Sequence, residues 1–159
     1  MVYSIDTTHQ LLGLPYSVDR LDTSPISDVV SIVRFKKVRF AAYFSDAGGT
    51  GDGTIKLQAS AAFDGSNPVD IPFRFHKSIA LDQMQAVHAS VAAGGTVPIT
   101  ANLGYQLIVL ECEAAQVPSG YDKVFAKLTE VTNEPVPGFM LIEMLEPDIT
   151  DDLYATQVA

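Results

Sequence analysis

The side chains that could carry chemistry in this chain are few and widely spaced. Its three histidines, His9, His76 and His88, have no second histidine or cysteine at the spacing of a metal site, so we expect no metal. Hydrolysis by a serine nucleophile often uses a Gly-x-Ser-x-Gly turn, which this sequence lacks. The single cysteine, Cys112, excludes an internal disulfide. It lies in the apolar run YQLIVLECEA, which favours a small core residue over a nucleophile.

Three carboxylates in predicted strands suggest a second possible chemistry. Paired carboxylates hydrolyse glycosidic bonds, and Glu111, Glu113 or Glu143 could in principle supply such a pair. Glu111 and Glu113 are two residues apart and therefore share one face of a strand. We interpret them as the solvated end of that strand.

A glycine-rich segment at residues 45–54, SDAGGTGDGT, could hold a cation through Asp46 and Asp52. It lacks the ligand spacing of an EF-hand, and no GK[ST] follows it as in a phosphate-binding loop. We therefore expect a flexible hairpin tip. The sequence gives no catalytic, cofactor-binding or metal-binding residue, and we expect neither an enzyme nor a cofactor.

Composition and charge narrow the class of protein. A chain of 159 residues that is 47% apolar can form one domain with a real core. Its net charge of −9 opposes binding to nucleic acid. Four of the ten basic residues lie within residues 34–39, whereas residues 130–159 hold seven acids and no Lys or Arg. This asymmetry could steer subunits together, or it could be a solvated basic strand and an acidic tail.

Neither a membrane span nor an export signal is predicted. No apolar stretch approaches the roughly 20 residues that cross a bilayer. The N-terminal residues MVYSIDTTHQLLGL lack the basic and apolar regions of a signal peptide. We expect the protein to be made and kept in a cytoplasm unless lysis releases it, with no membrane partner.

Alternating apolar and polar residues predict β-strands along most of the chain. Residues 36–45 and 54–62 alternate on either side of the glycine-rich segment, which predicts an antiparallel hairpin. Pro72 predicts that the strand at 70–77 is an edge strand or begins there. Residues 83–91 favour a strand but would also allow a short helix. The other predicted strands are 28–34, 104–114, 121–131 and 139–145.

Two of these strands carry specific predictions about burial. Residues 104–114 are apolar on both faces, which is typical of a central strand covered on both sides. In 121–131, one face carries Val124, Ala126 and Leu128, and the opposite face carries Phe125 between two lysines.

Seven or eight short strands, without amphipathic helices between them, predict an all-β protein. We expect an antiparallel β-sandwich or small barrel of jelly-roll type over residues 26–148. Weak periodicity and prolines predict an extended N-terminal arm at 1–25, and residues 149–159 form an acidic tail. The apolar residues of the arm need a surface, either of this domain or of a neighbour: Leu11, Leu12, Leu14 and Tyr16.

Three blocks of the sequence resemble a known family. They are GGTGDGT followed by IKLQASAAFDGSNPVDIPFRF, then YQLIVLECEAAQVPSGYDKVFAKLTEV, and then NEPVPGFMLIEMLEPD. As a set they are similar to a group of small tailed-bacteriophage and prophage proteins of similar length, encoded among the head genes. The resemblance covers roughly residues 26–148.

The resemblance implies a structural virion protein, first of all a capsid decoration (cement) protein on the outer head shell. Its implied partners are the major capsid protein and copies of itself, with a homotrimer favoured. It implies no catalytic residues. Two alternatives stay open: a head-completion, neck or tail subunit, and a carbohydrate-binding β-sandwich. The lack of tryptophan counts against the latter.

Overall fold

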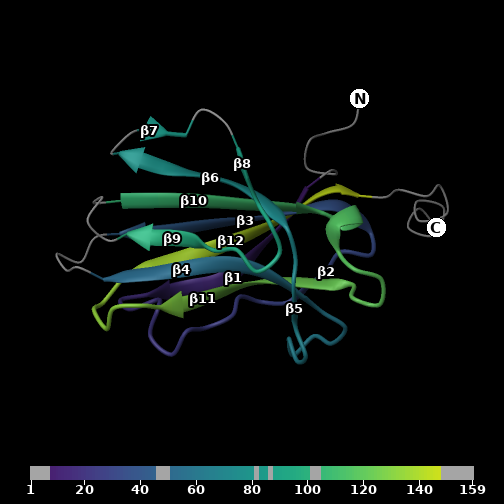
Figure 1. Cartoon of the computed structure of the whole chain (residues 1–159), viewed down its shortest axis with the longest axis horizontal. Coiled ribbons are helices and arrows are strands. Elements are labelled where there is room, and N and C mark those ends of the chain that lie inside the picture. Colours follow the sequence, from purple (N-terminus) through teal and green to yellow (C-terminus); the bar gives the residue numbers. More distant parts are fainter. Residues whose placement is uncertain (1–7, 46–50, 81–82, 86–87, 101–104, 148–159) are drawn as a thin grey trace, which may run out of the picture.

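Two antiparallel β-sheets pack face to face in the computed structural model of this chain (Figure 1). The seven-stranded sheet has the order β1-β12-β3-β10-β6-β7, with β8 also paired to β6. The five-stranded sheet has the order β2-β11-β4-β5, with β9 also paired to β4. The predicted all-β sandwich is therefore confirmed. The structure describes residues 8–45, 51–80, 83–85, 88–100 and 105–147.

The strands are longest where the sequence alternates most regularly. A single turn of 3-10 helix, η3 (Ala114–Gln116), follows β10. Among the described residues no helix is long and apolar enough to cross a membrane. The strands are β1 (Thr8–Ser17), β2 (Val30–Ser31), β3 (Phe35–Ser45), β4 (Asp52–Ser60), β5 (Val69–Asp70), β6 (Phe73–Ala80), β7 (Gln83–Met84), β8 (Ala89–Val91), β9 (Val97–Thr100), β10 (Tyr105–Glu113), β11 (Lys123–Glu130) and β12 (Gly138–Pro147).

The strands predicted at 36–45 and 54–62 exist, but they do not form the predicted hairpin. β3 pairs with β10 and β12 in one sheet, whereas β4 pairs with β11, β5 and β9 in the other. The two strands therefore lie in sheets that stack roughly 10 Å apart. A segment of this length can cross between sheets, whereas hairpins favour two-residue turns. The chain crosses again from β5 to β6, from β9 to β10, and on each side of β11, as in a jelly roll.

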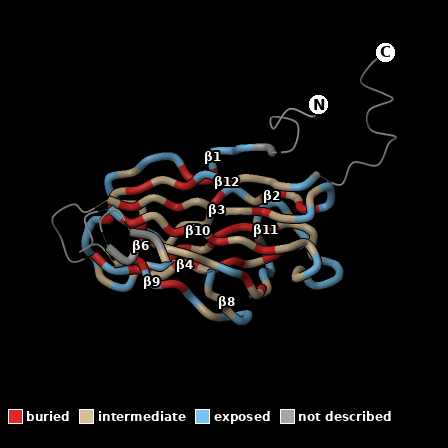
Figure 2. The backbone as a smooth tube through the Cα atoms, turned by 90° about the horizontal axis from the view of Figure 1, so that it is seen from above, coloured by how far each residue is buried: buried red, intermediate tan, exposed pale blue. Residues whose placement is uncertain are grey.

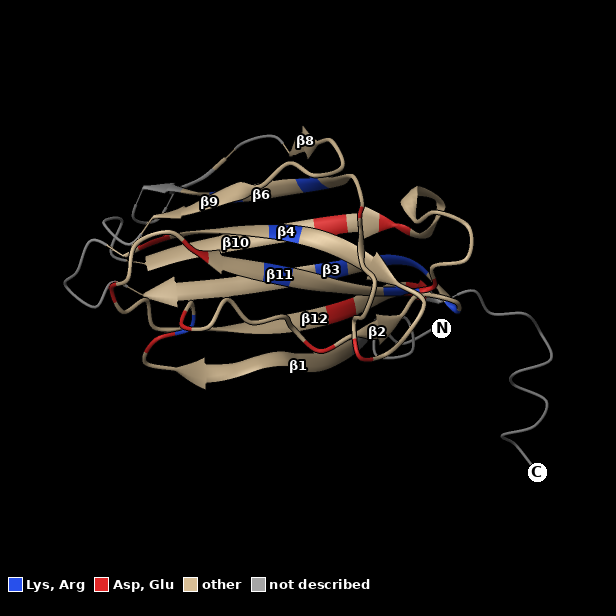
Figure 3. Ribbon diagram, turned by 60° about the horizontal axis from the view of Figure 1, so that its bottom comes forward, with Lys and Arg blue, Asp and Glu red and all other residues tan. Residues whose placement is uncertain are grey.

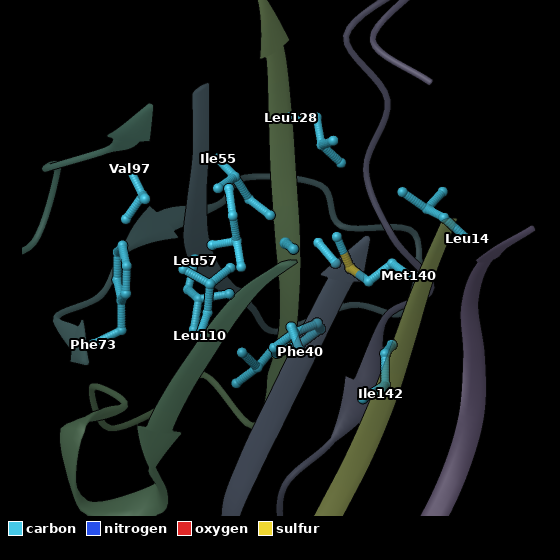
Figure 4. Packing of buried hydrophobic residues seen from close by; sticks show 14 of the residues in the cluster. Leu14, Phe40, Ile55, Leu57, Phe73, Val97, Leu110, Leu128, Met140 and Ile142 are labelled. Atoms are coloured by element: carbon cyan, nitrogen blue, oxygen red, sulfur yellow. The ribbon is translucent and has the colours of Figure 1, made fainter. Parts of the chain in front are cut away.

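The core lies between the two sheets and follows the alternation of the strands (Figures 2 and 4). Because β3 and β4 belong to opposite sheets, Phe40 and Leu57 enter the shared core from opposite sides. Burying such side chains contributes most of the stability of a sandwich. The buried faces of these two strands consist of Val38, Phe40, Ala42 and Phe44, and of Ile55, Leu57 and Ala59.

The segment expected as an extended arm, residues 1–25, contributes a strand to the sandwich. β1 pairs antiparallel with β12, and Leu14 packs into the core. Leu21, beyond the strand, is fully buried. The alternation of β1 is masked in the sequence because a register shift at Gly13 interrupts it.

A short strap at residues 25–28 ties the two sheets together beside β1. The backbone N–H of Ser27 donates to the carbonyl of Ala126 in β11, at 2.9 Å. The next N–H, that of Asp28, donates to the carbonyl of Gly13 in β1, at 2.8 Å. This strap closes one side of the sandwich and partly covers the edge of β1.

Several finer expectations need correction. Phe125 is buried on the outer face of β11, because Ile26 and the turn at Gly65 cover it. The outward side chains of the central strand β10, such as Val109, are only half-buried. Pro72 lies directly before β6, which confirms the alternative that a strand begins there. β6 has partners on both sides and is not an edge strand.

Other predictions fall on short elements or outside the described residues. The strand expected at 28–34 is reduced to β2, and β9 was not expected. Residues 83–91 contain the two short strands β7 and β8. The acidic tail at 149–159 and most of the glycine-rich tip, with Asp46, lie outside the described residues, while Asp52 begins β4.

Candidate functional site

Charged residues follow one another across neighbouring strands of the seven-stranded sheet (Figure 3), and their side chains form a polar row on its outer face. Arg39 of β3 lies between two carboxylates, with 3.1 Å to Glu111 of β10 and 3.3 Å to Glu143 of β12. Gln10 of β1 donates a hydrogen bond of 2.9 Å to Glu143. Register places these residues opposite one another, so the row links four neighbouring strands.

This row accounts for two of the carboxylates that were considered for glycoside hydrolysis. Catalysis of that kind needs room for the scissile bond between the carboxyl groups. Here the guanidinium of Arg39 occupies the space between Glu111 and Glu143. Glu113 lies beside η3, where its backbone N–H donates a hydrogen bond of 2.8 Å to the side-chain oxygen of Gln116 as part of a capping box. The arrangement is that of an ion network that joins strands.

An apolar patch adjoins the polar row on the same outer face. Leu12, Leu141, Ala41 and Val109 lie opposite one another across β1, β12, β3 and β10. Leu12 is 54% exposed and Leu141 is 38% exposed. We call this row, together with the aromatic residues beside it, the outer-face patch: Leu12, Ala41, Tyr43, Tyr105, Val109, Phe139 and Leu141.

Aromatic rings form one end of the outer-face patch. The ring centre of Tyr43 lies 6.0 Å from that of Tyr105, nearly parallel to it, and 5.4 Å from that of Phe139. Tyr105 is 56% exposed. Apolar and aromatic surface gathered in this way is typical of an interaction site.

The strand β1 forms an open edge next to the outer-face patch. Among the described strands it pairs only with β12, and the strap covers only its C-terminal part. Leu11 and Tyr16 are exposed on it. An edge strand offers unpaired backbone N–H and C=O groups to which another chain can add.

A groove opens at the end of the sandwich where β3 begins. It has a volume of about 550 Å³, and its walls come from β1, β12 and the segment that leads into β3. Most of its lining is apolar, including Leu11, Val33, Phe35 and Met144, and Arg34 is the charged residue in it. The volume is in the range of sites that hold a small molecule or a few side chains.

The four basic residues at 34–39 differ in their contacts: two of them form ion pairs with described residues and two do not. Lys37 contacts Glu146 at 3.0 Å, and Arg39 belongs to the polar row. Arg34 and Lys36 are exposed and have no ion pair with the described residues. Two of the four basic residues, Lys37 and Arg39, are therefore already paired within the described part of the chain.

Two of the three histidines lie together. The rings of His76 and His88 stack with their centres 4.4 Å apart and their planes at 7°. The ring nitrogens of two stacked imidazoles point within parallel planes and do not converge on one ion. Among the described residues no three potential ligands gather around a metal position. His9 lies in β1, and its side chain is outside the described part.

The environment of His76 lowers its pKa from the ordinary value of 6.5. Burial, which removes water from the charged form, is the largest cause. His88 and Arg39 lower the pKa further, and Glu111 opposes them. His76 therefore resists protonation on the outer face.

Cys112 is buried in β10, as predicted, at 1% exposure. Burial raises the pKa of its thiol to about 12, and the nearby carboxylates of Glu111 and Glu113 add to the rise. A thiol with this pKa stays protonated at neutral pH and is a poor nucleophile. Its position is that of a core side chain.

The fold and these surfaces define an antiparallel β-sandwich that presents an apolar outer face, an open edge and an end groove. A comparison with protein-family models, curated proteins and solved structures finds no match to this chain. Sequence reasoning missed the outer-face patch because its residues come from four strands whose order is not readable from periodicity. The alternation did indicate that Ala41 and Tyr43 point outward.

Proposed function

We propose that this protein is a structural virion protein of a tailed bacteriophage that binds the outer head shell as a decoration (cement) protein. The resemblance of residues 26–148 to phage head-gene products supports this proposal. The proposed partners are the major capsid protein and two further copies of this chain. The protein would be made in the host cytoplasm and carried on the capsid surface.

The observation that favours this function is the outer-face patch beside the open edge of β1. A shell protein of this kind must contact flat neighbouring surfaces, and a sheet face with exposed Leu12, Leu141 and Tyr105 suits that task. The edge could accept a strand from a shell subunit. Symmetry then multiplies contacts that are weak singly into tight binding.

The test uses purified protein and phage heads that lack it. We expect saturable binding over the whole shell and greater resistance of the heads to heat. Leu12→Asp with Leu141→Asp should weaken binding at least tenfold, because two carboxylates would be desolvated at the interface. Val131→Asp, at a valine that is 67% exposed outside the patch, is the control and should bind normally.

The pattern of binding to heads also distinguishes a decoration protein from other structural virion proteins. Binding at a single vertex, or ring-shaped oligomers in solution, would support a head-completion or neck subunit and contradict decoration. Binding that the paired aspartates leave unchanged would exclude the outer-face patch as the contact.

A carbohydrate-binding module is the second candidate, and the exposed ring of Tyr105 is the observation that favours it. Sugars stack on exposed aromatic faces, but here Tyr43 covers part of one face of Tyr105. A glycan array would detect such binding, and Tyr105→Ala should abolish it. Array binding without binding to heads would favour this second function.

A further inference from the structure

The groove at the start of β3 has apolar walls that the described residues leave uncovered. Leu11 and Met144 come from β1 and β12, and Val33 and Phe35 come from the segment that leads into β3 and from its first residue. Val33 is 65% exposed although it lies against this apolar surface. Apolar walls of this kind gain free energy when further apolar side chains exclude water from them.

The chain leaves the last strand at the rim of this groove. Pro147, the final residue of β12, lies opposite Phe35 in the register of β12 and β3. Glu146 turns the backbone just before it with a φ of 53°, and its carboxylate holds Lys37 at 3.0 Å. The last strand therefore ends opposite a residue that lines the groove.

The residues that follow complement the groove in both charge and hydrophobicity. Residues 148–159 read DITDDLYATQVA, with three aspartates, no lysine or arginine, and several apolar side chains. Arg34 lines the groove, and Lys36 follows the lining residue Phe35 in the sequence. Both basic side chains are exposed, and neither forms an ion pair with a described residue. Opposite charges at a rim fix the register of a docked segment.

We propose that residues 148–159 of the same chain dock in this groove as an intramolecular clasp. Ile149, Leu153 or Tyr154 supplies the apolar side chains, and the aspartates face Arg34 and Lys36. Leu153 is six residues beyond Pro147, a reach of up to about 20 Å when extended, which is enough to enter the groove. The tether keeps the segment at a local concentration of about millimolar, so modest contacts suffice.

A single tryptophan tests this clasp directly, because the chain contains none. In the full-length Tyr154→Trp variant, we expect blue-shifted emission and several-fold weaker quenching by acrylamide than in the unfolded protein. Adding Val33→Asp should shift the emission to that of an exposed indole, because the carboxylate repels the acidic segment and wets the groove. Val131→Asp is the matched control, at a valine of similar exposure outside the groove, and should change nothing.

A charge series separates the rim contacts from the apolar ones. Arg34→Glu should release the segment in low salt, whereas Arg74→Glu, an exposed arginine of β6, should not. Asp151→Lys with Asp152→Lys should restore the blue shift in the Arg34→Glu protein. Emission typical of an exposed indole in the parent variant, or a blue shift that survives Val33→Asp, would overturn the proposal. A blue shift that disappears on dilution would also overturn it, since it would assign the groove to a second copy.

Discussion

Arg39 shows how one side chain can join three strands of a sheet. Its guanidinium contacts Glu111 on one side and Glu143 on the other, and each carboxylate is less exposed than the arginine. A single exposed ion pair contributes little to stability, but a partly buried network in fixed geometry contributes more. Without the cation, two carboxylates would remain on the same face with no counter-charge between them.

Replacing Arg39 with methionine should therefore destabilise the protein by about 1 kcal/mol at neutral pH. Lys37→Met removes one ion pair to the exposed Glu146 and should have a smaller effect. Urea unfolding of both variants measures the difference. If Glu111→Gln and Glu143→Gln recover no stability in the Arg39→Met protein, the loss does not come from unpaired carboxylates.

His76 carries a pH dependence that follows from its surroundings. Burial and the neighbouring His88 and Arg39 hold its pKa in the folded protein below 6.5. The unfolded chain therefore binds more protons than the folded one when the pH falls below that value. The stability that His76 contributes is complete above pH 6.5 and is lost as the pH falls through its folded pKa.

We expect the melting temperature to fall as the pH drops below about 6.5, and to fall less in His76→Gln. His88→Gln should raise the pKa of His76, because the electrostatic effect of His88 lowers it. Titration of the His76 ring protons by NMR measures this directly. An unchanged His76 pKa in the His88→Gln protein would contradict the coupling of the stacked pair.

At the scale of elements, the N-terminal segment is part of the sandwich and its leucines differ sharply in burial. Leu21 is fully buried, whereas Leu12 is 54% exposed. Leu21→Ala should cost about 2–5 kcal/mol, because it removes packed atoms and leaves a cavity. Leu12→Ala is the matched control and should stay within about 0.5 kcal/mol of the parent. Denaturant unfolding compares them, and equal losses would contradict the packing of this segment.

The positions of the strands were predictable because one face of each strand is buried. The alternation at Val38, Phe40 and Phe44 reports this directly. Pairing was not predictable in the same way. β3 and β4 are adjacent in sequence and each alternates, and periodicity contains no signal that assigns them to different sheets. The strand β1 was not predicted because Gly13 interrupts its alternation. The backbone there packs so closely on Ile142 that a Cβ added at Gly13 would lie 2.5 Å from the Ile142 side chain.

The candidate surfaces depend on pairing and were therefore less predictable than the strands. Glu111 and Glu143 are distant in sequence, and only the order β10-β3-β12 brings both to Arg39. The outer-face patch has the same origin. The burial of Cys112, in contrast, can be predicted from its apolar run without knowing which strands pair, and this prediction is confirmed.

At the scale of the whole molecule, the two sheets are held as one unit by their shared core and by the strap at residues 25–28. The strap bonds one sheet through Ser27 and the other through Asp28. Cys112 lies on the inner face of β10, between β3 and β6. A reagent can reach this thiol only after the sheets separate or β10 leaves its neighbours.

Cys112 should therefore report the opening of the whole sandwich. Burial raises its pKa to about 12, so both access and ionisation protect the thiol in the folded state. At pH 8 we expect a disulfide reagent such as DTNB to react very slowly with the native protein and completely after unfolding. The free energy of opening, obtained from labelling rates across denaturant, should equal that of global unfolding.

The control is an exposed thiol in the same fold. Val131→Cys with Cys112→Val should label rapidly under native conditions, because that position is largely exposed. If Cys112 itself labelled with an opening free energy well below that of global unfolding, β10 would open locally although strands flank it on both sides. Such a result would contradict a sandwich that unfolds as one unit. β10 would then have a lower local stability than its pairing with both β3 and β6 implies.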